Sequence, residues 1–293
     1  MTLKYSETFY SAQGEGQYVG IPSLWMRFFL CNLQCNGFGQ TDPTDTSTYV
    51  LPYETLDLTD ITNVMDLPVF DKGCDSSYTW SKRYKHLITD RTVEDAVDEL
   101  TALLPLGKFV HPLTQQNVHM VFTGGEPMLK KTQPGMIGVL EEFGVRGNMP
   151  NFVTVETNGT RKIEDNLAEY IQDWMAGGRE WYWSLSPKLW ATAGEKAKKA
   201  IKPDVIGRYA EVSPHGQLKF VVNGTDESWR EVEEHTKLFR EAGCNFPVWI
   251  MGVGGTFEGL VQTEATIADE AIQRGYNYTS RVHVHIYGNA IGK

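Results

Sequence analysis

The chain has 293 residues, of which 41% are hydrophobic and 22% are charged, a composition typical of a globular protein with a sizeable core. Its formal net charge of −10, with acids and bases interleaved, argues against a surface that neutralises nucleic-acid phosphates. No window approaches the roughly 18 consecutive apolar residues of a membrane span, and residues 1–7 lack the apolar run of a secretory signal. We therefore expect a cytoplasmic protein that binds neither nucleic acid nor a membrane.

Short apolar runs alternate with amphipathic segments along most of the chain. Residues 23–29 predict a buried strand, and residues 92–104 predict a helix whose apolar positions share one face behind a Thr92 cap. The elements predicted after these, in chain order, are strands at 118–122 and 152–155, a helix at 163–175, strands at 181–185 and 217–222, a helix at 227–242, a strand at 247–251, a helix at 263–274 and a strand at 281–286.

This alternation predicts an α/β fold with a parallel sheet and right-handed crossovers. In such sheets the loops after the carboxyl ends of the strands carry the functional residues. Residues 38–73 break the rhythm, because they are rich in Thr, Asp and Pro and show no sustained period. A long irregular stretch in a compact domain indicates a functional loop or an insertion. We expect one domain over residues 1–293 with an insertion at about 38–73.

Four cysteines lie at positions 31, 35, 74 and 244. A disulfide framework is typical of small secreted chains, which this one does not resemble. Cys31 and Cys35 follow a predicted strand, and soft thiolates are the ligands of iron–sulfur clusters. Cysteines are also often simply buried, so the pair alone leaves the core and the cluster interpretations equally open. Cys244 follows a predicted helix and is expected to be a buried thiol without a role.

Several short motifs are spread over most of the chain, and some of them follow predicted strands. They are SAQGEG at 11–16, CNLQC at 31–35, CDSSYTW at 74–80, TGGEP at 123–127, ETNGT at 156–160 and SPK at 186–188. In this combination the chain resembles the 7-carboxy-7-deazaguanine synthase family of radical S-adenosylmethionine (SAM) enzymes. That family usually has a Cys-x3-Cys-x2-Cys motif, whose third position is Phe38 here. Cys74 and the tail after it resemble the third cysteine, displaced by the 38–73 insertion.

The resemblance implies an incomplete (β/α) barrel of the radical SAM type, with helices outside the sheet. It also implies a lyase that converts 6-carboxy-5,6,7,8-tetrahydropterin to 7-carboxy-7-deazaguanine with release of ammonia, a step in deazapurine and queuosine-type biosynthesis. The cofactors of such an enzyme are a four-iron, four-sulfur (4Fe-4S) cluster, SAM and Mg²⁺. Its partners would be the pterin substrate, an external flavodoxin-like electron donor and a second copy of the chain in a homodimer.

The same resemblance gives a role to individual positions. The cluster would be held by Cys31, Cys35 and Cys74, and Ser76 takes the place of a Mg²⁺-binding threonine. The residues expected to bind substrate are Gln13, Gly14, Glu15, Arg27, Thr123 and His285. The residues expected to bind SAM are Gly73, Asp75, Gly125, Glu156, Ser186, Pro187, Lys188, Met251 and Gly254.

These residue types suit the expected ligands. The Gln13 amide and the Glu15 carboxylate complement the donors and acceptors of a pterin edge. The Arg27 guanidinium can hold a substrate carboxylate with two hydrogen bonds, although an ion pair inside the barrel is the alternative. His283 and His285 alternate on the predicted final strand, and we take His285 as the substrate contact.

Two other interpretations remain open from the sequence. A different radical SAM enzyme, such as a glycyl-radical activase, would share the cluster and the Gly-Gly-Glu motif. A non-catalytic relative could instead bind zinc through the cysteines, and zinc would give no visible absorbance. The tryptophans at 174, 181, 183 and 190 are expected to serve packing rather than to bind a cofactor.

Overall fold

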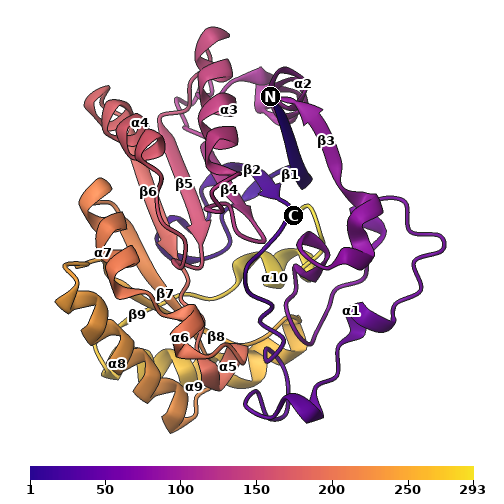
Figure 1. Ribbon diagram of the computed structural model, residues 1–293, viewed down its shortest axis with the longest axis vertical. Helices are drawn as coiled ribbons and strands as arrows, with labels where there is room; N and C mark the ends of the chain where they lie inside the picture. Colours follow the sequence, from indigo (N-terminus) through magenta and orange to yellow (C-terminus); the bar gives the residue numbers. More distant parts are fainter.

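The computed structural model describes all 293 residues and contains one nine-stranded sheet that curves around a central space (Figure 1). The strand order is β3-β1-β2-β4-β5-β6-β7-β8-β9. The strands are β1 Thr2–Ala12, β2 Pro22–Phe28, β3 Thr89–Thr92, β4 His119–Gly124, β5 Phe152–Thr157, β6 Glu180–Leu185, β7 Gly216–Val222, β8 Val248–Gly252 and β9 Asn277–Tyr278. Because the edge strands β3 and β9 do not pair, the barrel stays open.

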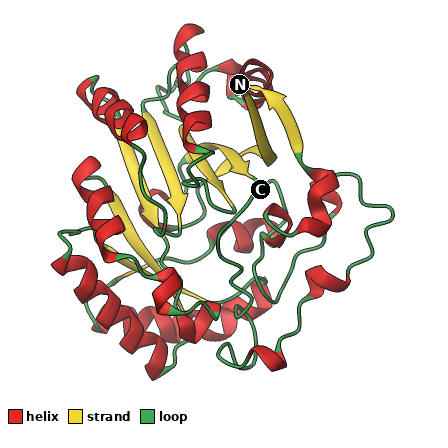
Figure 2. Ribbon diagram, viewed as in Figure 1, coloured by secondary structure: helices red, strands yellow, loops and turns green.

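Helices cover the outer face of this sheet (Figure 2). The longer helices are α2 Val93–Leu103, α3 Gln133–Val145, α4 Asp165–Ala176, α7 Pro203–Val212, α8 Asp226–Glu241 and α9 Phe257–Gln273. The short ones are α1 Pro52–Thr55, α5 Trp190–Ala193, α6 Ala197–Ala200 and α10 Val282–Tyr287. The α/β fold with its mostly parallel sheet is confirmed, and no helix is long and apolar enough to cross a membrane.

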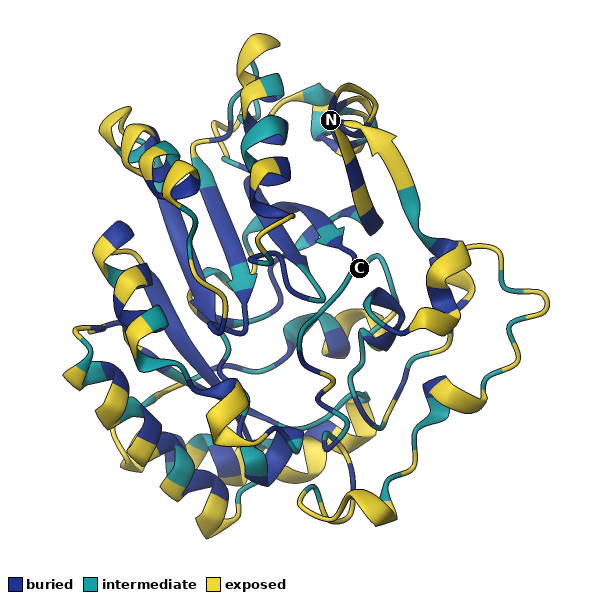
Figure 3. Ribbon diagram, in the orientation of Figure 1, coloured by how far each residue is buried: buried dark blue, intermediate teal, exposed yellow.

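The local sequence explains why the central elements form. The Thr92 side chain accepts a hydrogen bond from the Asp95 amide at the start of α2, as a capping residue does. Every residue of β7 is buried, because parallel strands are covered on both faces. Figure 3 shows the same pattern, with buried strands inside and helices exposed on their outer sides. Trp181 and Trp183 are fully buried and meet edge to face, which confirms their packing role.

The final strand predicted at 281–286 is wrong, since these residues form α10 and the sheet ends at β9. Apolar and polar residues alternate there as in a strand, but β9 has only two residues and offers little edge to pair with. Only Val284 of α10 is buried, and Gly288 ends the helix in the left-handed conformation.

The predicted parallel sheet has one antiparallel edge, where β1 runs antiparallel to β2 and β3. Helices α3 and α7 were not predicted from the sequence. Three glycines interrupt the apolar pattern of α3, which weakens its helical signal.

Residues 38–73 fold into short turns and helices, which share a second small core with residues 78–87. The buried side chains of this second core are Tyr53, Val64, Leu67, Phe70, Tyr78, Tyr84 and Leu87. The segment leaves and returns at one place, because the Gly73 amide donates a hydrogen bond of 2.7 Å to the Phe38 carbonyl. A loop with its ends tied together can be long without displacing the residues on either side of it.

His119, at the start of β4, makes stability depend on pH. Its ring stacks on Phe152 with centroids 4.5 Å apart, and burial lowers its pKa to about 4. The unfolded chain binds that proton near pH 6.5, so acidification from about 6.5 to 4 favours unfolding, by up to about 1.4 kcal/mol per pH unit. His119→Phe keeps an aromatic ring and should reduce the loss of unfolding free energy between pH 7 and pH 5 in urea titrations.

His86 is exposed, so His86→Phe is the control. It should lose as much unfolding free energy between pH 7 and pH 5 as the wild-type chain does. An unchanged pH dependence in His119→Phe would show that this ring is not the titrating group.

Candidate active site

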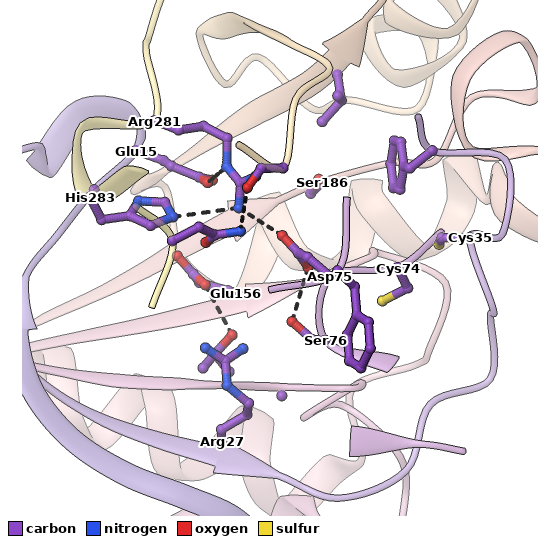
Figure 4. Close-up of a pocket in the computed structure, with 18 of the residues that line it drawn as sticks. Glu15, Arg27, Cys35, Cys74, Asp75, Ser76, Glu156, Ser186, Arg281 and His283 are labelled. Atoms are coloured by element: carbon purple, nitrogen blue, oxygen red, sulfur yellow. Dashed lines mark hydrogen bonds and ion pairs between the residues drawn. The ribbon is translucent and has the colours of Figure 1, made fainter. Parts of the chain in front are cut away.

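A pocket opens at the carboxyl ends of the parallel strands, where Figure 4 shows its polar side chains converging. It is lined by loops that follow β1, β2, β4, β5, β6 and β8, by the end of the 38–73 segment and by the C-terminal residues. All the site residues expected from the sequence line this pocket except Pro187 and His285. Residues from the two ends of the chain therefore meet at one site.

Three of the four cysteines lie at this pocket. Cys31, Cys35 and Cys74 are free thiols that line it and pack into one small cluster with Leu33. Cys244 is instead buried in the main core, as expected. The hydrogen bond that closes the 38–73 segment brings Cys74 back to the Cys31–Cys35 loop, although it is 39 positions after Cys35 in the sequence.

The cysteine loop is held in a fixed shape by its neighbours. One Glu195 oxygen accepts hydrogen bonds from the Gln34 amide at 2.7 Å and the Cys35 amide at 3.0 Å. Cys35 has a φ of 53°, a left-handed conformation that costs energy for a residue with a side chain. On the other side, a Cβ on Gly125 would lie 2.3 Å from the Leu30 carbonyl oxygen. Only glycine allows the β4 loop to pass this close.

These thiols fit an iron–sulfur cluster. Burial raises the pKa of Cys31 to about 12 and that of Cys74 to about 11, so the free thiols hold their protons, which ligation to iron would release. Three unpaired thiols around one cavity can bind three corners of a four-iron cluster and leave one iron open. No three His, Cys, Asp or Glu side chains lie close enough together to hold a single metal ion.

A network of buried charges joins the loops on the opposite side of the pocket. Glu15 pairs with Lys219 of β7 and, at 3.0 Å, with Arg281. Arg281 also reaches Asp75 and the Gly254 carbonyl, each at 2.7 Å (Figure 4). Burial alone would raise the pKa of Glu15, but the charges of Lys219 and Arg281 outweigh it and hold this pKa well below its usual range. Glu15 is therefore a fixed carboxylate at neutral pH.

A second set of polar contacts lies around Arg27. Its Nε is 2.5 Å from Glu7, whose same oxygen accepts a hydrogen bond of 2.7 Å from Tyr78. Arg27 thus forms the interior ion pair that was the alternative to a substrate contact, yet its side chain still lines the pocket. Glu156 lies beyond it and accepts hydrogen bonds from Gln13 at 3.3 Å and Thr123 at 3.0 Å.

His285 must be replaced by His283 as the histidine of this pocket. His285 contacts Glu264 at 3.1 Å outside the site, whereas His283 lies 3.4 Å from Arg281. In a strand the two rings would lie on one face. In a helix, residues two positions apart are rotated by about 200° around the axis, so their side chains point in nearly opposite directions. Burial, reinforced by the Arg281 charge, lowers the pKa of His283 to about 4, so the ring is neutral at pH 7.

The residues expected from the sequence to bind SAM are spread around the pocket. Lys188 donates a hydrogen bond of 2.8 Å to Ser186, and both side chains line the pocket, while Pro187 between them does not. Gly73, Asp75, Met251 and Gly254 also line it. A lysine with a hydroxyl neighbour and exposed backbone groups is suited to bind the carboxylate and hydroxyl groups of a small ligand.

Sequence reasoning missed three charged groups of the site. Lys219 lies in the apolar run of β7, and a lysine is almost never fully buried unless it is paired. A lysine in a predicted buried strand could therefore have indicated a buried ion pair. Arg281 and Glu7 gave no comparable signal, because their partners follow only from the folded structure. The Glu126 of TGGEP has a structural role, since it accepts hydrogen bonds from Thr157 at 2.6 Å and from the Asn158 amide at 2.9 Å.

No protein-family model matches the chain. The 7-carboxy-7-deazaguanine synthase of Rhodopirellula baltica is 27% identical, with 99% of this chain and 89% of that protein covered. The enzymes of the same name from Pyrobaculum aerophilum and Halobacterium salinarum are 25% and 28% identical, with 99% and 98% of this chain and 97% and 91% of theirs covered.

A solved structure resembles the fold over the same length. The crystal structure of QueE from Escherichia coli superposes with a TM-score of 0.52 at 15% identity, covering 97% of this chain and 95% of that one. At this identity the likeness shows a shared fold only. The evidence for homology comes from the three relatives found by sequence. The chain is a distant homologue of the 7-carboxy-7-deazaguanine synthases over nearly its full length.

Proposed function

We propose that this chain is a radical SAM lyase that converts 6-carboxy-5,6,7,8-tetrahydropterin to 7-carboxy-7-deazaguanine and ammonia. The observation that carries the proposal is convergence at one pocket. Motifs at 11–16, 31–35, 74–80, 123–127 and 186–188 are far apart in the sequence, yet each contributes side chains to its wall. Near-full-length relatives that bear this activity in their names support the same reading.

The thiol side of the pocket would hold the cofactors. Cys31, Cys35 and Cys74 would bind the cluster, and Ser186 and Lys188 would bind SAM beside it. When bound, these two groups supply the radical chemistry, which the protein itself cannot perform. The chain contributes orientation, because each wall of the pocket is tied to a strand end, and it limits the access of water to the reacting centre.

The opposite side would bind the pterin. Glu15 is a buried carboxylate held by two cations and can accept hydrogen bonds from the N–H groups of the ring edge. The neutral ring of His283 can donate or accept one hydrogen bond beside it. Arg27 would bind the substrate carboxylate with the guanidinium nitrogens that Glu7 does not use.

The Mg²⁺ ion would sit near the substrate carboxylate. Ser76 lines the pocket and donates a hydrogen bond of 3.1 Å to Asp75. A single hydroxyl is a weak ligand, but Mg²⁺ usually keeps several waters and takes other oxygens from its substrate. We also infer that an external flavodoxin-like donor supplies electrons and that the active form is a homodimer.

Replacing Arg27 tests the substrate assignment. Arg27→Lys keeps the charge but loses the planar fork that holds a carboxylate with two bonds. We expect kcat/KM for the pterin to fall by about tenfold to a hundredfold, which corresponds to about 1.4–2.7 kcal/mol. The dissociation constant for SAM, measured by calorimetry, should change little. Kinetics equal to those of the wild-type chain would remove Arg27 from the substrate site.

The proposed reaction is tested by its product. Anaerobic, reduced and iron–sulfur-reconstituted protein should form 7-carboxy-7-deazaguanine from the pterin, faster with Mg²⁺ than with a chelator present. The visible absorbance of the reconstituted protein identifies the metal group, because zinc is colourless. A colourless, zinc-loaded protein without product would favour the non-catalytic relative.

A further inference from the structure

A second hollow lies on the outer side of the cysteine loop, and we call it the lysine basin. Its lining residues are Gln34, Asn36, Thr46, Tyr49, Leu51, Trp190, Gly194, Glu195, Lys196, Lys198 and Lys199. Gln34 lines both the lysine basin and the active-site pocket. The loop that carries Cys31 and Cys35 is therefore the wall between the two cavities, and the basin opens on its surface side.

The lysine basin is positively charged in a chain whose net charge is −10. The side chains of Lys196, Lys198 and Lys199 are exposed, and Lys202 follows close behind them in the sequence. Only Lys199 has a carboxylate partner, Glu195 at 2.9 Å. Three of these four lysines therefore have no carboxylate within ion-pair distance.

Acids on the facing loop do not neutralise these lysines. Asp42 accepts hydrogen bonds from the amide and hydroxyl of Thr44, and Asp45 does the same with Ser47. Neither aspartate forms an ion pair with a lysine of the basin. Half-buried Trp190 adds an aromatic surface to the floor, and aromatic residues are enriched where proteins meet.

The basin is linked to the cysteine loop by one carboxylate. Glu195 pairs with Lys199 through one oxygen, and through the other it accepts the Gln34 and Cys35 amides. A protein seated on these lysines would thus lie one layer of residues from a cluster ligand. Electron transfer between proteins uses small, weak interfaces, and complementary charge brings such partners together quickly.

We propose that the lysine basin is the docking site for an acidic, one-electron-carrying protein. This inference rests on the proposed function, which requires one electron from outside the chain. The donor loses one electron and the cluster held by Cys31, Cys35 and Cys74 gains it, with no bond formed or broken and no proton transferred.

The test uses reconstituted protein and a reduced, acidic flavodoxin as the probe. Lys196→Glu/Lys198→Glu reverses two exposed charges without touching the Lys199–Glu195 pair. Lys108→Glu/Lys237→Glu makes the same change of charge outside the basin. The readouts are the calorimetric dissociation constant for flavodoxin, the rate of cluster bleaching in stopped flow, and product formation driven by dithionite.

The basin variant should bind flavodoxin at least about tenfold more weakly at low salt and be reduced more slowly. Its product formation with dithionite should equal that of the wild-type chain, and the control variant should retain normal binding. Unchanged binding in the basin variant, or equal weakening in the control, would overturn the docking site. Failure of the wild-type chain to form deazapurine with dithionite would instead reject the proposed function, because no docking partner takes part in that assay.

Discussion

Cys74→Ala should abolish cluster-dependent cleavage of SAM. If Cys74 is the third cluster ligand, only two thiolates remain after the change, and a four-iron cluster with two protein ligands is not retained. The expected result is loss of most of the bound iron and of the visible absorbance, with SAM cleavage below detection. Cys31→Ala and Cys35→Ala should have the same effect, because all three thiols line one cavity.

Cys244→Ala is the matched control, since this thiol is buried in the main core and away from the pocket. It should cost some stability, as loss of a buried group does, but leave the iron content unchanged. A Cys74→Ala protein with a full cluster and normal activity would show that the 38–73 segment does not return a ligand to the site.

Arg281→Lys is expected to have the second large effect. The guanidinium contacts Glu15, Asp75 and the Gly254 carbonyl at once, and a lysine ammonium on a flexible stem cannot replace this fork. Glu15 should then move relative to the pterin, so kcat/KM for the pterin should fall by about a hundredfold or more, because misplacement by about 1 Å has that cost. Steady-state kinetics at saturating SAM measure this.

Arg274→Lys provides the comparison for Arg281. Arg274 also pairs with a carboxylate, Glu233 at 2.6 Å, but it lies outside the pocket. Its replacement should leave kinetics within about twofold of the wild-type values, because exposed ion pairs contribute little. If the two variants lost activity equally, Arg281 would act only through stability.

The sequence predicts the central part of the fold because its signals are local. The strands that became β4 to β8 are apolar runs buried on both faces, and such runs are visible without knowledge of their partners. Strand β1 was missed because its apolar and polar residues do not alternate regularly. Its conformation depends on pairing with β2 and β3, which no local pattern encodes.

The site shows the same division. Short motifs at strand ends predicted most of the residues that line the pocket, since parallel strands place their carboxyl ends together. The ion pairs were not predictable: Glu15 meets Lys219 and Arg281 at separations of 204 and 266 residues. The choice between His283 and His285 was not predictable either, because a strand would place both rings on one face, whereas helix α10 points them in different directions. Errors therefore fall where tertiary contacts, rather than local pattern, decide the structure.

The balance of products in one anaerobic reaction tests the proposed lyase activity. Reconstituted, reduced protein is incubated with 6-carboxytetrahydropterin, SAM and Mg²⁺, and 7-carboxy-7-deazaguanine, ammonia and 5′-deoxyadenosine are quantified by mass spectrometry and enzymatic assay. We expect equal amounts of deazapurine and ammonia, with far less 5′-deoxyadenosine than product, because SAM is regenerated in each cycle. Cleavage of SAM without any deazapurine would contradict it and assign the chain to another radical SAM reaction.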